Sequence, residues 1–159
     1  MTFQELLTYT RGPSWLTPKR LVALDPGETC GLAFFEWGEL IDTEQIKLYF
    51  KSGDRGWDSL VDRIEQIVPT VVVYEDYKIY PGKLKAHTFS GVPTLKLIGA
   101  IEFLCNYNKY QAVPQMASTA KGFCTDDKLK EWGFYKRGRP HAMDALRHGL
   151  HALLFNKEL

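Results

Sequence analysis

A chain of 159 residues with 45% hydrophobic and 25% charged residues has the composition of an average globular protein and is long enough for a substantial core. Its net charge of +1 excludes no class of partner, because a balanced total can conceal a basic face. Since no apolar run approaches the roughly 18 residues of a membrane span and no secretion signal or zinc-type cysteine spacing is present, we expect a cytoplasmic protein without a membrane partner.

The first half of the chain predicts four strands and one helix. Apolar or partly alternating runs at 21–25, 31–36 and 40–50 are typical of strands, and the short glycine-containing connections between them favour antiparallel neighbours. Residues 57–68 have the apolar periodicity of an amphipathic helix, which Pro69 ends. The β-branched run at 70–74 is typical of a strand that is covered on both faces.

The second half predicts helices around one further strand. Residues 92–107 have a helical apolar face, and 111–116 predict a strand whose Pro114 favours an edge position. Thr125 is a suitable cap for a short helix that Gly133 ends, and Pro140 suits the first turn of a last helix reaching about residue 155. The order β-β-β-α-β-α-β-α-α predicts one α/β domain over residues 1–159: a ribonuclease H-like mixed five-stranded sheet, three antiparallel strands followed by two parallel ones, with helices on both faces.

Two carboxylates end apolar strands. Asp25 follows the first strand and Glu75 follows the fourth, and if these strands are parallel neighbours both acids emerge at the same end of the sheet. Asp25 precedes Pro-Gly, so taken alone it is equally suited to capping a turn. The pair of strand-end acids favours a functional site.

A third group of polar residues begins the last helix. His141 and Asp144 are three residues apart and therefore project from one side of its first turn. Small residues at 142, 145 and 149 form a separate face that allows the helix to press against the sheet and bring this turn to the strand ends. The alternative interpretation is that His141 and Asp144 begin a solvated polar face of a surface helix. His148 and His151 continue the same polar stripe along the helix, and we assign them to such a solvated face.

Hard cations would explain this set of residues. Carboxylates on two strands plus a helical Asp and His are suited to two Mg²⁺ or Mn²⁺ ions about 3.5–4 Å apart, which activate water and stabilise the leaving oxygen of a phosphodiester. Without metal, clustered acids repel one another and repel phosphate. An imidazole among carboxylates is compatible with either ion.

The motifs ALDPGETCGLAFFE, VVVYED, TLKLIGAIEFL and HAMDALRHGLHALL, in this order and spacing over about residues 20–155, resemble the RuvC family of Holliday junction resolvases. The resemblance implies a ribonuclease H fold and a catalytic, metal-binding tetrad that falls on Asp25, Glu75, His141 and Asp144. It further implies a crossover junction endodeoxyribonuclease of DNA recombination and repair that cuts two symmetric strands of a four-way junction. The compact, divergent chain favours a phage-type member acting in a bacterial or phage-infected cell.

The resemblance also implies a homodimer, because two nearby sites must cut opposed strands. The helix at 92–107 matches the region that relatives use to dimerise, although its residues equally suit a core helix. Residues 1–19 precede the usual first strand of the family. This N-terminal extension is expected to cover a sheet edge or to touch DNA.

Basic and aromatic residues flank the acids on both sides and predict contacts with branched DNA. In bacterial relatives, an aromatic residue three positions after the glutamate of the fourth strand wedges into the junction. This chain has Lys78 at that position. The wedge residue is therefore Tyr77 or Tyr80, or is absent. Of two family lysines, one is retained as Lys128 and Lys121 replaces the other from a shifted position, although both also suit an ordinary surface. The full predicted DNA-binding set is Tyr77, Lys78, Tyr80, Lys83, Lys85, Lys121, Lys128, Arg137 and Arg139.

Two other functions remain open from the sequence. The same fold and ions would serve a nuclease for RNA–DNA hybrids, flaps or other branched DNA. A noncatalytic junction-binding protein is the third possibility, and the presence of all four tetrad positions speaks against it.

Overall fold

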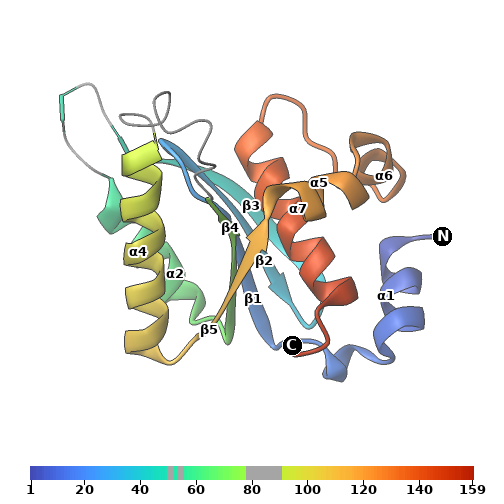
Figure 1. Cartoon of the computed structure of the whole chain (residues 1–159). Helices are drawn as coiled ribbons and strands as arrows, with labels where there is room; N and C mark the ends of the chain where they lie inside the picture. Colours follow the sequence, from blue (N-terminus) through green and yellow to red (C-terminus); the bar gives the residue numbers. More distant parts are fainter. Residues whose placement is uncertain (50–51, 54–55, 78–90) are drawn as a thin grey trace.

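The computed structural model describes residues 1–49, 52–53, 56–77 and 91–159 of the chain. Five strands form one mixed sheet in the order β3-β2-β1-β4-β5 (Figure 1). β1 (Arg20–Asp25), β2 (Thr29–Glu36) and β3 (Glu39–Lys47) are antiparallel neighbours, whereas β4 (Val71–Asp76) runs parallel to β1, and β5 (Gln111–Met116) runs parallel to β4. The expected fold class, including the edge position of the last strand, is confirmed.

A two-residue turn fixes the register of the β2–β3 hairpin. Trp37 and Gly38 both have positive φ, 51° and 79°, and Glu36 pairs with Glu39 across them. Two consecutive positive φ values give the turn whose twist matches that of the flanking strands, and a glycine adopts this conformation without strain. The turn at Trp37 and Gly38 therefore accounts for the antiparallel pairing that the short connection predicts.

Helices cover both faces of the sheet (Figure 1). One layer contains α2 (Trp57–Ile67) and α4 (Gly91–Asn108). The other is centred on α7 (Pro140–Phe155) and includes α5 (Ala117–Phe123), α6 (Asp126–Glu131), α1 (Phe3–Arg11) and the short 3-10 helix η1 (Ser14–Leu16).

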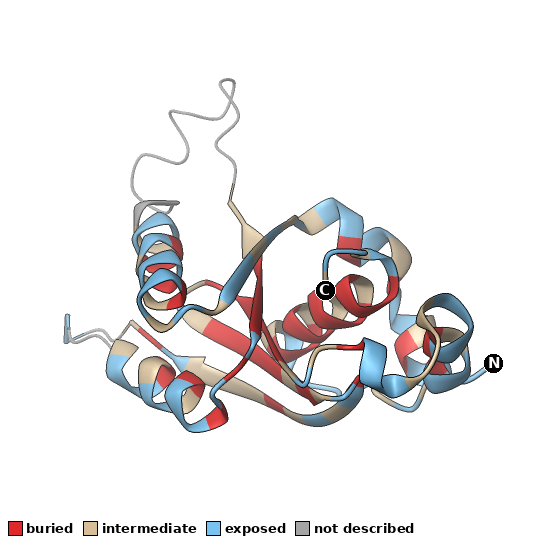
Figure 2. Ribbon diagram, turned by 90° about the horizontal axis from the view of Figure 1, so that it is seen from below, coloured by how far each residue is buried: buried red, intermediate tan, exposed pale blue. Residues whose placement is uncertain are grey.

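The central strands are buried on both faces. Along β1, Leu21 and Ala23 belong to the core beneath α7, whereas Val22 and Leu24 belong to the core beneath α2 and α4. β4 alternates in the same way, and Figure 2 shows the buried residues concentrated in the strands and α7. This two-sided burial explains why both strands have uninterrupted apolar sequences.

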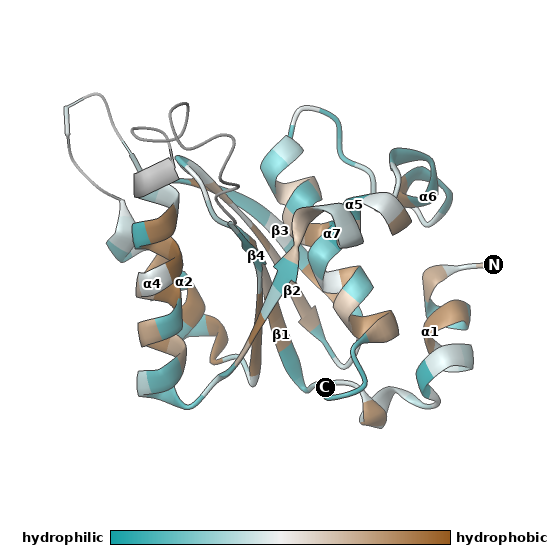
Figure 3. Cartoon of the chain, in the orientation of Figure 1, coloured by the Kyte–Doolittle hydropathy of each residue, from teal (hydrophilic) through white to brown (hydrophobic). Residues whose placement is uncertain are grey.

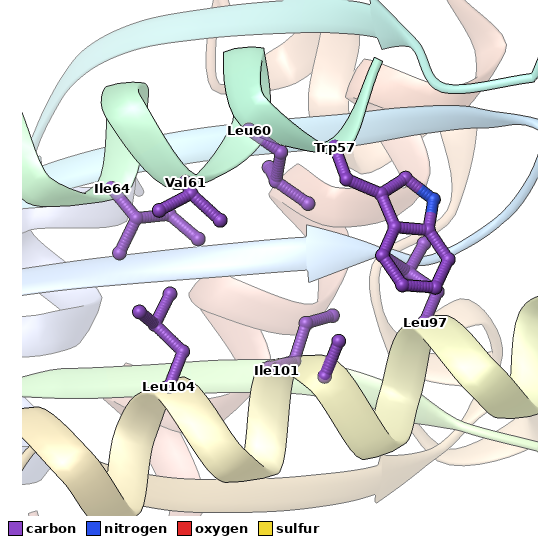
Figure 4. Close-up of a pocket in the computed structure, with 8 residues that line it drawn as sticks. Trp57, Leu60, Val61, Ile64, Leu97, Ile101 and Leu104 are labelled. Carbon is purple, nitrogen blue, oxygen red and sulfur yellow. The ribbon is translucent and has the colours of Figure 1, made fainter. Parts of the chain in front are cut away.

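The seam between α2 and α4 is a packing contact. Figure 4 shows their apolar side chains facing one another, with Trp57 at one end and Leu104 at the other. The cavity between them is small, about 30 Å³. Within the described ranges, no helix is both long and apolar enough to cross a membrane.

α7 lies close to the sheet because of its small residues. A Cβ on Gly149 would come within 2.3 Å of the Phe35 ring and 3.1 Å of the Ala23 side chain, so a larger residue would push the helix away. Ala142 and Ala145 are fully buried on the same helix. The close approach predicted for this face is present.

Among the described residues, two α-helices, α1 and α5, were missing from the sequence prediction. α1 falls within residues 1–19, where Thr2 and Glu5 form a capping box, and the buried Phe3 contacts Trp132 and Phe134. The extension thus packs beside α7, and Gln4 donates a hydrogen bond to the carbonyl of Gly38. α5, the second helix, packs on α7 directly after β5.

Candidate active site

Asp25 and Glu75 meet at one end of the sheet. β1 and β4 are parallel neighbours with Leu24 paired to Tyr74, so the next residue on each strand is one of the two acids. Asp25 is buried, whereas Glu75 is half-buried. The juxtaposition expected from the two strand ends is present.

The first turn of α7 lies directly over β2 and delivers His141 to Asp25. Gly31 pairs with Asp25 across the β1–β2 ladder, and a Cβ on Gly31 would lie 1.8 Å from the carbonyl oxygen of His141. The absent side chain therefore makes room for the helix. His141 Nδ1 lies 2.9 Å from Asp25 Oδ2.

The start of α7 is capped by a residue from β3. Arg139 precedes the helix and forms no side-chain cap, and instead Gln45 Oε1 accepts hydrogen bonds from the backbone N–H groups of His141 and Ala142, at 3.1 and 3.3 Å. Unpaired N–H groups at a helix start need such partners. Gln45 was not predicted as a site residue, because a cap supplied 96 positions away leaves no local sequence signal.

A lysine joins the remaining two acids. Lys121, on α5, places its Nζ 3.2 Å from Glu75 Oε2 and 2.9 Å from Asp144 Oδ2. The sequence placed Lys121 near the scissile phosphate by resemblance, and the structure places it at the carboxylates themselves. The position between these two acids therefore already attracts a positive charge.

Arg147 and His148 also contact the acids. Arg147 donates to Asp144 Oδ1 at 2.5 Å and to the carbonyl of Cys124 at 2.8 Å, and it also pairs with Asp126. His148 Nε2 lies 3.1 Å from Glu75 Oε2. The assignment of His148 to a solvated face was wrong, since its side chain is 0% exposed. Helical periodicity places His148 on the polar side of the last helix, but it does not show that β4 and β5 cover this position.

The pKa values of Asp25 and Glu75 are shifted in opposite directions. Burial raises the pKa of Asp25 to about 6, and the nearby charges of Glu75 and Asp144 add to the rise against the hydrogen bond from His141. For Glu75, burial acts to raise the pKa, but the hydrogen bond with His148 and the charge of Lys121 outweigh it and leave the pKa below its ordinary value. The site is thus a partly desolvated acidic cluster that a cation would stabilise.

The donor set fits a hard divalent cation. Carboxylate oxygens dominate it, and such oxygens are the ligands that Mg²⁺ and Mn²⁺ prefer. In the described part of the chain, no three His, Cys, Asp or Glu side chains are already arranged to hold an ion. The acids are paired with Lys121, Arg147 and the two histidines, so a bound ion would share or replace these contacts at the carboxylate oxygens.

The predicted DNA-binding residues are distributed over several places. Lys78, Tyr80, Lys83 and Lys85 lie outside the described residues. Tyr77 is half-buried against the core under α2 and α4, and Lys128 lies over the Phe123 ring, 3.6 Å from its centroid. Arg137 is exposed, and Arg139 donates to the carbonyl of Thr43 at 3.1 Å.

A polar cavity adjoins the acids. Its volume is about 160 Å³, and Asp144 and Arg147 line it together with Lys136, Arg139 and Tyr135. Lys136 Nζ donates to Thr43 Oγ1 at 3.1 Å. Among the described residues, Lys136 and Arg139 form no ion pair, so their charges are available to an anion.

The sheet order, with helices on both faces, gives an α/β domain with a ribonuclease H-like fold. The structure is similar to that of T. thermophilus RuvC in complex with a Holliday junction substrate, with a TM-score of 0.67 and 14% identity over 87% of this chain and 95% of that one. It is also similar to the fowlpox virus resolvase in a Holliday junction DNA complex (TM-score 0.53, 16% identity, 84% and 97% covered) and to the yeast mitochondrial resolvase Ydc2 (0.52, 12%, 95% and 82%).

These likenesses give the chain the fold of the Holliday junction resolvases. No family model matches the sequence, and no curated protein matches it significantly.

Proposed function

We propose that this chain is an endonuclease that resolves four-way DNA junctions by symmetric hydrolysis of two phosphodiesters, using two Mg²⁺ or Mn²⁺ ions per site. The observation that supports the proposal is the meeting of Asp25, Glu75, His141 and Asp144, from β1, β4 and α7, at one end of a resolvase-type sheet. We further propose that it acts in the cytoplasm of a bacterial or phage-infected cell.

The three carboxylates would serve as ligands of the two metal ions. Asp25 would contact both ions, Glu75 one and Asp144 the other, and His141 would ligate an ion or position the attacking water. When bound, two such ions activate water and stabilise the leaving oxygen of a phosphodiester. His141 is suited to its role because Nδ1 is held by Asp25 and Gln45 fixes the backbone of its helical turn.

Cationic side chains would hold the DNA. Lys121 is 39% exposed at the carboxylates and is the residue we expect at the scissile phosphate, where its charge would stabilise the transition state. Lys136, Arg137 and Arg139 precede α7, and the cavity beside Asp144 gives a neighbouring phosphate a place to approach. These charges would make binding strongly dependent on salt.

The decisive test is a panel of labelled substrates incubated with the protein in Mg²⁺ and in Mn²⁺. Paired symmetric cuts confined to four-way junctions are the expected result. Equal or faster cutting of RNA–DNA hybrids or flaps would assign the site to another nuclease substrate. Junction binding without nicking, together with no Mn²⁺ uptake in calorimetry, would identify a noncatalytic binding protein.

Dimerisation through α4 is part of the proposal. Leu95, Gly99, Phe103 and Tyr107 recur every four residues along one side of this helix, and Figure 3 shows apolar residues along much of it. Phe103 and Tyr107 are 69% and 73% exposed, and their rings stack on each other. A Cβ on Gly99 would meet nothing within 4 Å, so a partner helix has close access to this side.

Replacement of Phe103 by Glu should therefore weaken the dimer by roughly a hundred-fold, the size of a typical aromatic hot spot. Analytical ultracentrifugation measures the dissociation constant. Tyr9→Glu is a matched control, because Tyr9 is an 85% exposed aromatic on α1 in the other helical layer. Equal association of the wild type and both variants would show that α4 is not the interface.

A further inference from the structure

His148 is a fully buried ionisable side chain beside the acids. It lies on α7, its side chain is 0% exposed, and its ring joins two adjacent strands. Nε2 lies 3.1 Å from Glu75 Oε2 on β4, and Nδ1 lies 3.0 Å from Gln115 Oε1 on β5. Glu75 and Gln115 are direct partners in the β4–β5 ladder, so the imidazole spans this pair from above.

Both ring nitrogens of a buried imidazole need partners, and here both have one. A carboxylate can only accept, so the Nε2–H group of His148 donates to Glu75. The side-chain amide of Gln115 can present either an acceptor or a donor and thus serves Nδ1 in any protonation state of the ring. The arrangement therefore fixes the direction of the hydrogen bond to Glu75.

This hydrogen bond selects one oxygen of Glu75. His148 and Lys121 both contact Oε2, so these two contacts leave Oε1 for other partners. Their mobility differs, since Lys121 is a long side chain that is 39% exposed, whereas His148 is packed inside the domain. If an incoming cation displaces Lys121, His148 still holds Glu75.

We propose that His148, supported by Gln115, is a positioning residue that orients Glu75 for binding a divalent cation. The proposal rests on the proposed function, because it assigns Glu75 the role of a metal ligand. Residues that hydrogen-bond a ligating carboxylate typically contribute 10- to 100-fold to metal affinity. The next histidine on the helix, His151, packs between Phe123 and Phe155 and provides a natural contrast.

The test compares Mn²⁺ binding, measured without DNA by electron paramagnetic resonance, in His148→Leu, His148→Gln and the control His151→Leu. We expect His148→Leu to weaken Mn²⁺ binding by about 10- to 100-fold. His148→Gln, which keeps an N–H donor, should recover part of this loss, and His151→Leu should match the wild type. In nicking assays, His148→Leu should lower kcat at an unchanged KM for the junction.

A second variant protects the test against misfolding. Gln115 is only half-buried, so Gln115→Leu should fold even if His148→Leu does not, and it should weaken Mn²⁺ binding by roughly 3- to 10-fold through the loosened imidazole. If folded His148→Leu binds Mn²⁺ as tightly as the wild type, the inference about His148 is wrong but the proposed function stands. If His148→Leu does not fold, wild-type Mn²⁺ affinity in Gln115→Leu has the same meaning. Failure of the wild type itself to bind Mn²⁺ or to nick any substrate overturns the proposed function.

Discussion

Replacing Asp25 with Asn is expected to lower the rate of junction nicking by about a thousand-fold or more. Asp25 is the carboxylate that we assign to both ions, and loss of several kcal/mol of transition-state stabilisation corresponds to a factor of this size. Binding of the junction should change only a few-fold, because the basic side chains around the site are untouched. Nicking under single-turnover conditions and fluorescence anisotropy measure the two quantities separately.

The same substitution should stabilise the protein at neutral pH. The pKa of Asp25 is about 6 in the folded protein, against 3.8 for the ordinary group, so the folded state holds this proton more tightly than the unfolded chain does. The stabilising contribution of the protonated acid is complete below pH 3.8 and is lost as the pH rises to 6. Ionised Asp25 therefore costs up to about 3 kcal/mol at pH 7, a cost that Asn does not carry.

Urea unfolding between pH 4 and pH 8 checks this expectation. The difference in free energy of unfolding between Asp25→Asn and the wild type should be near zero at pH 4 and largest above pH 6. Asp62→Asn on the exposed face of α2 is the control and should show no such trend. If Asp25→Asn nicks at the wild-type rate, Asp25 has no role in the mechanism. If Asp25→Asn is less stable than the wild type at pH 8, the ionised Asp25 side chain does not destabilise the folded protein.

The sheet and the convergence of Asp25, Glu75, His141 and Asp144 at one end of it were predictable because their signals are local. Uninterrupted apolar runs mark β1 and β4, and a polar residue at the end of each run marks the edge where the site forms. The spacing of His141 and Asp144 likewise needs only helical periodicity. Parallel pairing of β1 and β4 then brings separate segments together, and the right-handed crossover rule predicts that pairing.

The missed features depend on contacts between distant segments. The helix α5 has the sequence ASTAKGF, which has weak helical propensity, and it forms where it can pack on α7. Gln45 and His148 look like ordinary polar residues until β3 and β5 are placed beside α7. Of these missed features, α1 alone has a local sequence signal, the capping box of Thr2 and Glu5.

Gly31 gives a stringent test of how the site is assembled. It pairs with Asp25 in the sheet, and a Cβ at this position would lie 1.8 Å from the oxygen and 2.3 Å from the carbon of the His141 carbonyl, and 2.9 Å from the nitrogen of Ala142. All three atoms belong to the backbone, so no side-chain rotation relieves the clash. The first turn of α7 would have to move away from β2.

Gly31→Ala should consequently cost about 3 kcal/mol or more of stability, at the upper end of the usual effects of overpacking. The displaced turn would lengthen the 2.9 Å contact between His141 and Asp25, and a shift of about 1 Å at a catalytic centre lowers rates by around a hundred-fold. Gly122→Ala is the matched control, because it adds a methyl group to α5 with no atom within 4 Å and should stabilise that helix by about 0.5–1 kcal/mol. Wild-type stability and nicking in Gly31→Ala would mean that α7 does not rest on β2, and the geometry argued for His141 would then be wrong.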